Sequence, residues 1–329
     1  MVDHYRRATD PGVPDAGLAR EIVVPTDCAG LRLDQALARL LPQHSRSRLK
    51  TWIDRGLVTL DGEVPLPRRR LEGGESLVVR DAPDEDAITD APQAIALPIV
   101  FEDDAILVID KPAGLVVHPG AGNRGGTLLN ALLHHAPALA KLPRAGIVHR
   151  LDKDTSGLMV VAKTPAAQTD LVRQLQARTV TRHYLALARG DLARSVIVDA
   201  PIGRHPVQRT TMAVVASGKP ARTHVDVLER HGATTLVRCR LETGRTHQIR
   251  VHLASLGHPL VGDPVYGGRG ANRPQPLRAF PRQALHAERL ALAHPVTRRE
   301  CAWTSPLPRD FAELLASIDA EPPTPVRVR

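Results

Sequence analysis

Aromatic side chains are scarce in this sequence, since Phe, Trp and Tyr together make up 2% of its 329 residues. Proteins that hold single-stranded nucleic acid mainly by stacking present several aromatic platforms. Any nucleic-acid binding here should therefore depend on charge and shape, with one or two unstacked bases at most. Apolar runs are also short, and none approaches the ~20 residues of a membrane-spanning helix. Residues 1–20 lack the apolar core of a secretory signal, so we expect a cytoplasmic protein.

Cysteine is rare as well, with residues at positions 28, 239 and 301 only. An odd number of widely separated cysteines fits neither a disulfide framework nor a zinc site. The glycines at 120, 122, 125 and 126 match neither a P-loop nor a dinucleotide fingerprint. We therefore expect no metal and no nucleotide cofactor.

Positive charge is in excess. The 44 Lys and Arg residues outnumber the 35 Asp and Glu residues, which gives a net charge of +9. Such a balance favours a polyanionic partner, either nucleic acid or an acidic membrane surface. The hydrophobic content of 43% allows a sizeable core, and the length allows two domains at ~100–200 residues each.

The first predicted domain is small and basic. The leucines of 31–41 have a mostly helical spacing, and a second helix should run from the N-cap Ser45 to the stop at Gly56. In this second helix Leu49, Trp52 and Ile53 should face inward. The Asp-Gly turn at 61–62 predicts a hairpin over 58–64, and the apolar residues of 77–79 should close a small sheet.

Two short helices, a basic face and a hairpin resemble the S4 RNA-binding domain. This resemblance implies that the basic residues of the second helix contact RNA: Arg46, Arg48, Lys50 and Arg55. A solvated basic helix is the alternative. The acidic segment 81–90 has no periodicity and predicts a linker. The expected organisation is a tail over 1–20, the S4-like domain over 21–80, a linker over 81–96, a larger domain over 97–318 and a tail over 319–329.

The larger domain should mix strands and helices. The sequence predicts a hairpin over 99–109, a helix that opens at 127–130, a strand over 158–162, a helix over 166–178, and strands over 181–188 and 236–241. A further helix should begin at the N-cap Thr246 and end at Gly257.

A polar loop precedes the strand at 158–162. It groups a carboxylate with a guanidinium, because Asp152 follows Arg150 closely. A cation lowers the pKa of a nearby Asp below its ordinary ~3.9, and an ionised Asp in a pocket can attack a sugar carbon. Taken alone, Asp152 could equally cap a turn, and Asp154 is a second candidate.

His149-Arg150-Leu151-Asp152 with Thr155-Ser156-Gly157 resembles the signature loop of the RluA-type pseudouridine synthases. The runs 182–186 and 243–253 resemble two further motifs of that family. The implied fold is α+β, with a mixed, largely antiparallel sheet, flanking helices and the S4-like domain in front. The resemblance implies that Asp152 is the nucleophile, that Arg250 pairs with it, and that Tyr184 packs on the uracil and takes its C5 proton. It also implies substrate contacts from His149, Arg150, Thr155, Arg245 and His247.

The implied reaction isomerises uridine to pseudouridine without metal, nicotinamide or ATP. The implied substrate is large-subunit ribosomal RNA, at the loop of its helix 69, and we expect a monomer. Whether the carboxylate attacks C1′ or C6, or promotes elimination, stays open. So do three other functions: an assembly factor that binds RNA without modifying it, an RNA N-glycosylase, and a synthase for other rRNA or tRNA sites.

Overall fold

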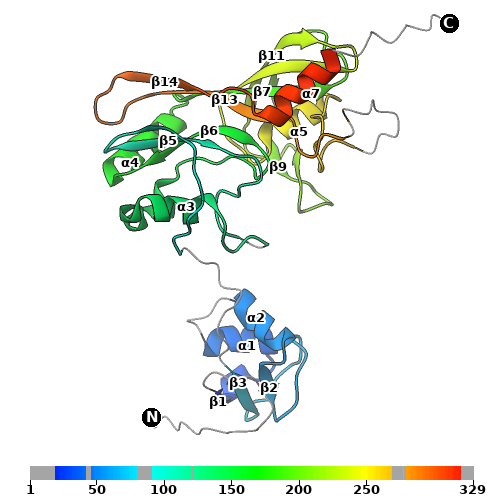
Figure 1. The fold of residues 1–329 in the computed structure, drawn as a ribbon. Helices are drawn as coiled ribbons and strands as arrows, with labels where there is room; N and C mark the ends of the chain where they lie inside the picture. The colour runs from blue at the N-terminus through cyan, green and yellow to red at the C-terminus, as the bar shows by residue number, and fades with distance from the viewer. Residues whose placement is uncertain are drawn as a thin grey trace, which may run out of the picture. The chain divides into compact units, whose positions relative to one another are not determined.

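The computed structural model describes residues 19–41, 46–80, 91–120, 122–268, 277 and 279–319, without the side chains of 46–48 and 319. The chain divides into two compact units, Met1–Ala87 and Ile88–Arg329 (Figure 1). The expected terminal tails fall almost entirely outside the described residues, as does the acidic segment 81–90.

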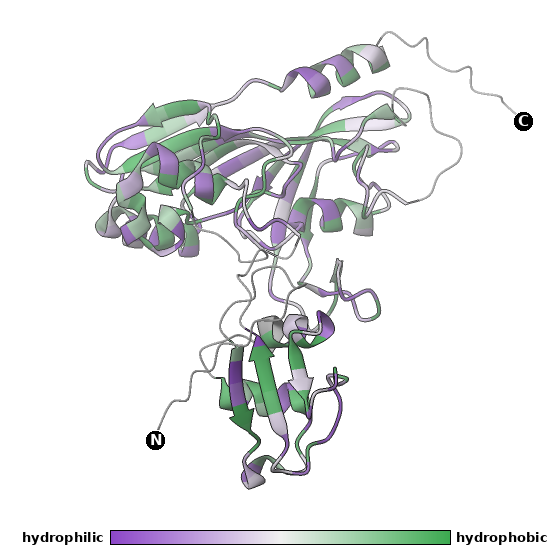
Figure 2. Ribbon diagram, turned by 60° about the horizontal axis from the view of Figure 1, so that its bottom comes forward, coloured by the Kyte–Doolittle hydropathy of each residue, from purple (hydrophilic) through white to green (hydrophobic). Residues whose placement is uncertain are grey.

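The first unit contains β1 (Ala19–Val23), the short 3-10 helix η1 (Thr26–Cys28), α1 (Leu33–Leu40), α2 (Arg46–Asp54), β2 (Val58–Leu60) and β3 (Ser76–Arg80). Its antiparallel sheet has the order β1-β3-β2. Figure 2 shows hydrophobic residues along these strands. Leu49, Trp52 and Ile53 of α2 are buried against the sheet and α1, which confirms the predicted inward face. The predicted N-cap of α2, Ser45, lies outside the described residues.

The predicted hairpin over 58–64 is only partly correct. Asp61 and Gly62 both have positive φ, at 51° and 85°, and make the expected tight turn. Beyond it, however, a single bridge joins Leu60 to Glu63, and the strand that pairs with β2 is β3. Pro65 follows almost at once and has no backbone N–H to donate. The returning chain therefore cannot extend the ladder.

The second unit is an α+β domain. Its strands are β4 (Ile99–Glu102), β5 (Ile106–Lys111), β6 (Ser156–Ala162), β7 (Thr181–Arg189), β8 (Val196–Asp199), β9 (Ile202–Arg204), β10 (Met212–Val214), β11 (Arg222–Arg230), β12 (Thr234–Leu241), β13 (Leu285–Ala293) and β14 (Glu300–Thr304). Its helices are α3 (Leu128–His135), η2 (Pro137–Lys141), η3 (Pro143–Gly146), α4 (Pro165–Gln176), α5 (Gln248–Ser255) and α7 (Arg309–Asp319).

One large sheet organises this unit, with the order β4-β5-β6-β13-β7-β12-β11-β8 and β14 paired to β13. Strands β6 and β13 are parallel, and the other pairs are antiparallel. The expected mixed, largely antiparallel sheet is confirmed. β9 and β10 form a separate two-stranded ribbon.

Alternate residues of β5, β6 and β7 pack into different cores, because successive side chains point to opposite faces. The largest core joins α3 and α5 to Tyr184, Ala186 and Ala188 of β7. Leu187 of the same strand instead packs with α7 in a separate core. Every second residue of β7, counted from Tyr184, therefore faces the side on which α5 lies. This alternation decides which side chains of β7 reach the site described next.

Candidate active site

The polar loop predicted from the sequence runs from Ile147 to β6. Thr155 is buried inside it and accepts a hydrogen bond from Gln283 Nε2 at 3.1 Å. Gly157, the second residue of β6, follows the loop and has a φ of +114°. A Cβ there would lie 2.4 Å from the carbonyl oxygen of Ala287 on β13. Glycine thus lets β6 and β13 approach closely enough to pair.

Lys111, at the end of β5, holds this loop in place through its side chain. Its ammonium is fully buried and donates to three carbonyl oxygens, those of Pro112 at 2.8 Å, Leu115 at 3.0 Å and Lys153 at 2.9 Å. Burial lowers the pKa of Lys111 to about 7, although the charges of Asp154 and Asp152 oppose the shift. The sequence analysis assigned Lys111 no role.

Asp152 lies beside Arg250, as the resemblance implied. Arg250 Nη1 donates to Asp152 Oδ2 at 2.9 Å. The other side of the guanidinium binds Asp263, through Nε at 2.7 Å and Nη2 at 2.9 Å. Arg250 is thus held between two carboxylates, of which Asp263 is fully buried and Asp152 is 15% exposed.

The shared arginine governs the charges of this cluster. Burial alone would lower the pKa of Arg250, but the hydrogen bond and charge of Asp263, together with Asp152, raise it. Burial would raise the pKa of Asp263, but Arg250 holds it below its ordinary value. Both groups are therefore charged at neutral pH, and Asp152 is the carboxylate of the cluster that opens into the pocket. Sequence reasoning did not single out Asp263, which follows Arg250 by 13 residues.

His247 touches the same cluster. Its Nε2 lies 3.8 Å from Asp152 Oδ1, and its Nδ1 lies 2.8 Å from the hydroxyl of Tyr266. That hydroxyl accepts a hydrogen bond from the Met212 N–H at 3.0 Å, and the Tyr266 ring packs 5.1 Å from the Arg250 guanidinium. Tyr266 therefore connects the first residue of β10 to both partners of Asp152.

The predicted N-cap of α5 was wrong by one residue. His247, not Thr246, occupies the cap position, with a φ of 56° and no capping side-chain hydrogen bond. The Gln248 side chain instead binds the chain that leads into the helix, because its Oε1 accepts from the Arg245 N–H at 3.0 Å.

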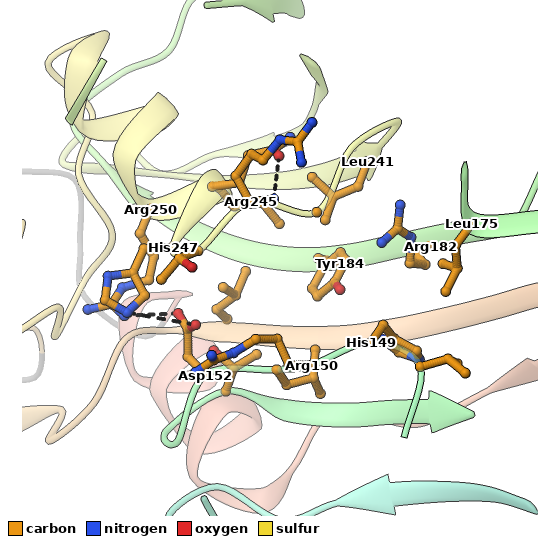
Figure 3. A pocket seen from close by; sticks show the side chains of 18 of the residues that line it. His149, Arg150, Asp152, Leu175, Arg182, Tyr184, Leu241, Arg245, His247 and Arg250 are labelled. Atoms are coloured by element: carbon orange, nitrogen blue, oxygen red, sulfur yellow. Dashed lines mark hydrogen bonds and ion pairs between the residues drawn. The ribbon is translucent and has the colours of Figure 1, made fainter. Parts of the chain in front are cut away.

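A cavity of about 530 Å³ opens beside the cluster (Figure 3). This volume lies within the ~300–1,000 Å³ of ordinary small-ligand sites. Tyr184 lies in its wall (Figure 3), and its hydroxyl has no hydrogen-bond partner in the described part of the chain. Burial raises the pKa of the Tyr184 phenol, so the phenol is neutral at physiological pH.

The remaining predicted substrate residues also line this cavity, but several side chains have structural partners. His149 Nε2 accepts a hydrogen bond from the Val160 N–H at 3.1 Å. Burial, with the charge of Arg182, lowers the pKa of His149 to about 3, so the ring is neutral. Arg245 Nε donates to the Pro220 carbonyl at 3.0 Å. Arg150 is exposed and has no partner among the residues that the structure describes.

Asp154, the rival carboxylate, does not line the cavity. Its backbone carbonyl accepts a hydrogen bond from Arg282 Nη1 at 3.1 Å, and Arg250 binds Asp152 instead. Within the described residues, no group of three His, Cys, Asp or Glu side chains could hold a metal ion. In the same residues, no helix has the length and hydropathy needed to cross a membrane.

In the first unit, Lys50 and Arg55 are exposed. Arg46 and Arg48 lie on α2, but their side chains are outside the described set.

Comparison with known proteins identifies the family of this chain. Residues 105–255 match the RNA pseudouridylate synthase family, and residues 31–77 match the S4 domain. The chain is 60% identical over 303 residues to the ribosomal large subunit pseudouridine synthase D of Nitrosomonas europaea, covering 91% of this chain and 87% of the relative. This chain belongs to the RNA pseudouridine synthase family. It is therefore an isomerase.

Other relatives agree with this assignment. This chain is 57% identical over 308 residues to the ribosomal large subunit pseudouridine synthase D of Pseudomonas aeruginosa, covering 92% of this chain and 96% of that relative. Its structure is similar to that of human RNA pseudouridylate synthase domain containing 1, with a TM-score of 0.52 and 29% identity, covering 71% of this chain and 98% of the other. It is also similar to that of human RNA pseudouridylate synthase domain containing 4, with a TM-score of 0.54 and 26% identity, covering 69% of this chain and 95% of the other.

Proposed function

We propose that this synthase isomerises uridine in large-subunit ribosomal RNA and that Asp152 is its nucleophile. The observation that carries the proposal is the position of Asp152. It is the carboxylate at the mouth of the cavity that Arg250 orients, and Arg250 is itself fixed by buried Asp263. The substrate class rests on the names of the relatives, which act on the large ribosomal subunit. We accordingly propose that the enzyme acts in the cytoplasm, where bacterial ribosomes are made.

The reaction needs only rearrangement of one nucleotide. The N1–C1′ bond breaks, the base turns, a C5–C1′ bond forms, the C5 proton leaves and N1 gains a proton, so no electrons are exchanged with a partner. Asp152 initiates cleavage, by attack on C1′ or C6 or by promoting elimination across C1′–C2′. Arg250 keeps the carboxylate oriented through the 2.9 Å hydrogen bond.

Tyr184 packs against the uracil in this proposal. Because its buried phenol is neutral, it is a poor base, and packing explains its position better than removal of the C5 proton does. The target uridine has to leave its stack, which costs a few kcal/mol and less in a loop than in a duplex. The exposed Arg150 guanidinium is free to fill the space that the base leaves.

We propose the loop of helix 69 as the target and the S4 domain as an additional RNA contact, with Lys50, Arg55 and their neighbours Arg46 and Arg48 binding phosphates. We further propose a monomer with the domain boundaries expected from the sequence, except that β1 begins at Ala19, inside the tail expected over 1–20. Contacts to phosphates release counterions, so RNA affinity should fall steeply with salt. Filter-binding between ~50 and ~200 mM salt tests this, and a nearly constant affinity would argue against phosphate binding by the basic face.

The first experiment uses large-subunit RNA that carries tritium at uridine C5. Isomerisation must release that tritium to water. We expect release by the wild-type enzyme, none by Asp152→Asn with RNA binding retained, and nearly normal release by Asp154→Asn. Mapping the modified positions then identifies the target loop.

Two results would contradict the proposal. Loss of turnover in Asp154→Asn with activity retained in Asp152→Asn would transfer the nucleophile to Asp154. Absence of release by the wild type on naked RNA and on assembling subunits would favour an RNA-binding assembly factor, and free uracil among the products would indicate an N-glycosylase.

A further inference from the structure

Arg182 is a cation of the cavity that the site described above leaves without a function. It lies on β7 two residues before Tyr184, so both side chains face the cavity that they line. Only 8% of Arg182 is exposed. Its Nε is buried without a hydrogen-bond partner, and its other nitrogens have no hydrogen bond or ion pair within the described part of the chain.

A buried, unpaired guanidinium is unfavourable, and arginine cannot escape the cost by losing its proton. The surroundings do not offset the charge. Among the described residues, one carboxylate lines the cavity, that of Asp152, which already binds Arg250. The cavity is also lined by further arginines: Arg144, Arg150 and Arg245.

The charge of Arg182 affects its neighbours. It adds to burial in lowering the pKa of His149, and it opposes burial at Tyr184, where it favours the anionic form of the phenol. Both rings lie within reach of this positive charge, and no described acid compensates it. In the free protein, the positive charge of Arg182 therefore lacks a counter-charge among the described residues.

The position of Arg182 indicates which part of a ligand it would meet. Figure 3 shows it near Leu175 and Leu241, away from Asp152, with Tyr184 between the two charged groups in that view. Its Nη1 lies 3.0 Å from the place that a Cβ at Gly244 would occupy. Glycine at 244 thus leaves room for the guanidinium to lie in the wall of the cavity.

We propose that Arg182 binds a backbone phosphate of the RNA next to the flipped uridine. This inference rests on the proposed function and extends it by naming a substrate contact. A phosphate supplies the missing negative charge, and its oxygens match the planar fork of the guanidinium. A uracil carbonyl could accept a hydrogen bond from Arg182, but it is neutral and would leave the charge uncompensated.

The contact is tested by changing Arg182 and single phosphates of the RNA, separately and together, and measuring the affinity each time. The probes are stem-loop RNAs with one target uridine, each carrying a single neutral methylphosphonate at one phosphate around the target. Affinities are measured with Asp152→Asn and with Asp152→Asn/Arg182→Gln, so that no turnover intervenes. For one flanking phosphate we expect the protein with Arg182 to lose roughly 10- to 100-fold in affinity, and the double variant to bind weakly but to be indifferent to the modification.

Two other results would contradict the proposal. If the losses from Arg182→Gln and from the methylphosphonate multiply at every position, Arg182 does not bind a phosphate. If the double variant instead becomes indifferent to replacement of a uracil carbonyl, Arg182 reads the base, and the proposal is wrong. Failure of the proposed function would appear separately, as absence of tritium release by the wild type.

Arg289 provides a matched control. It is exposed on β13 and pairs in register with His183, which neighbours Arg182 and points to the opposite face of the sheet. Arg289→Gln removes the same charge and should change neither the affinity nor the methylphosphonate pattern. A change as large as that of Arg182→Gln would show that net charge, not a site, is responsible.

Thermal unfolding distinguishes a role of Arg182 in RNA binding from a role in folding. Because Arg182→Met removes an unpaired buried charge and keeps an apolar stem, its Tm should equal or exceed that of the wild type. A lower Tm together with a uniform loss of affinity for all the RNAs would assign Arg182 a structural role and overturn the inference.

Discussion

Asp263 determines how firmly Arg250 and the proposed nucleophile Asp152 are held, and Asp263→Asn is the sharpest test of this. The substitution keeps the size of the side chain but removes the charge that receives two hydrogen bonds from Arg250. Breaking a buried ion pair costs ~3–5 kcal/mol. We expect about 3 kcal/mol, the lower end, because Asp152 still neutralises Arg250. For a domain of this size that corresponds to a fall in Tm of ~6–12 °C.

The effect on activity should be separable from the effect on stability. With one side of its guanidinium released, Arg250 no longer holds Asp152 in a single position. A displacement of ~1 Å at a reacting group can cost ~100-fold in rate. We therefore expect kcat to fall about 100-fold with a nearly unchanged KM, measured by tritium release well below the Tm of the variant.

The pH dependence supplies a third readout. Arg250 keeps the pKa of Asp263 in the folded protein below its ordinary value, so its contribution to stability is present above ~pH 4 and is lost as the pH falls through the folded-state pKa. The difference in Tm between wild type and Asp263→Asn should thus be constant near neutrality and shrink below about pH 4.

Asp199 offers a control at the surface. It also accepts hydrogen bonds from two nitrogens of an arginine, Arg222, but both side chains are largely exposed. Exposed pairs of this kind are screened by solvent, so Asp199→Asn should change neither Tm nor kcat measurably. If Asp263→Asn behaves like Asp199→Asn, our account of the buried cluster is wrong.

Two further predictions concern neighbouring parts of the site. Burial lowers the pKa of Lys111 to about 7, so the unfolded chain binds more protons between ~pH 7 and ~pH 10, and the wild type should gain stability relative to Lys111→Met as the pH rises through this window. Urea unfolding at several pH values measures this, and a constant difference would refute it. Tyr266→Phe removes the hydroxyl that joins the Met212 N–H to His247, and should cost about 1 kcal/mol of stability and lower kcat without weakening RNA binding. An unchanged kcat would show that His247 needs no support from Tyr266.

The sequence by itself determined the local structure and the family motifs that predict the site. Hydrophobic spacing predicted the helix at 166–178, observed as α4, and the strand at 181–188, observed as β7. Such patterns succeed because the periods of helices and strands are local properties of the chain. The family motifs then pointed to Asp152 and Arg250, although spacing alone could not have paired residues 98 positions apart.

Only the tertiary structure decided what surrounds these two residues. The fold brings Asp263 against Arg250, joins the Lys111 ammonium to the loop that carries Asp152, and leaves Arg182 buried without a partner in the described part of the chain. Strand alternation puts Arg182 on the side of Tyr184, but no local pattern shows whether an acid lies opposite. The sheet order β6-β13-β7 brings distant segments together, and the balance of charge inside a cavity depends on all of them at once.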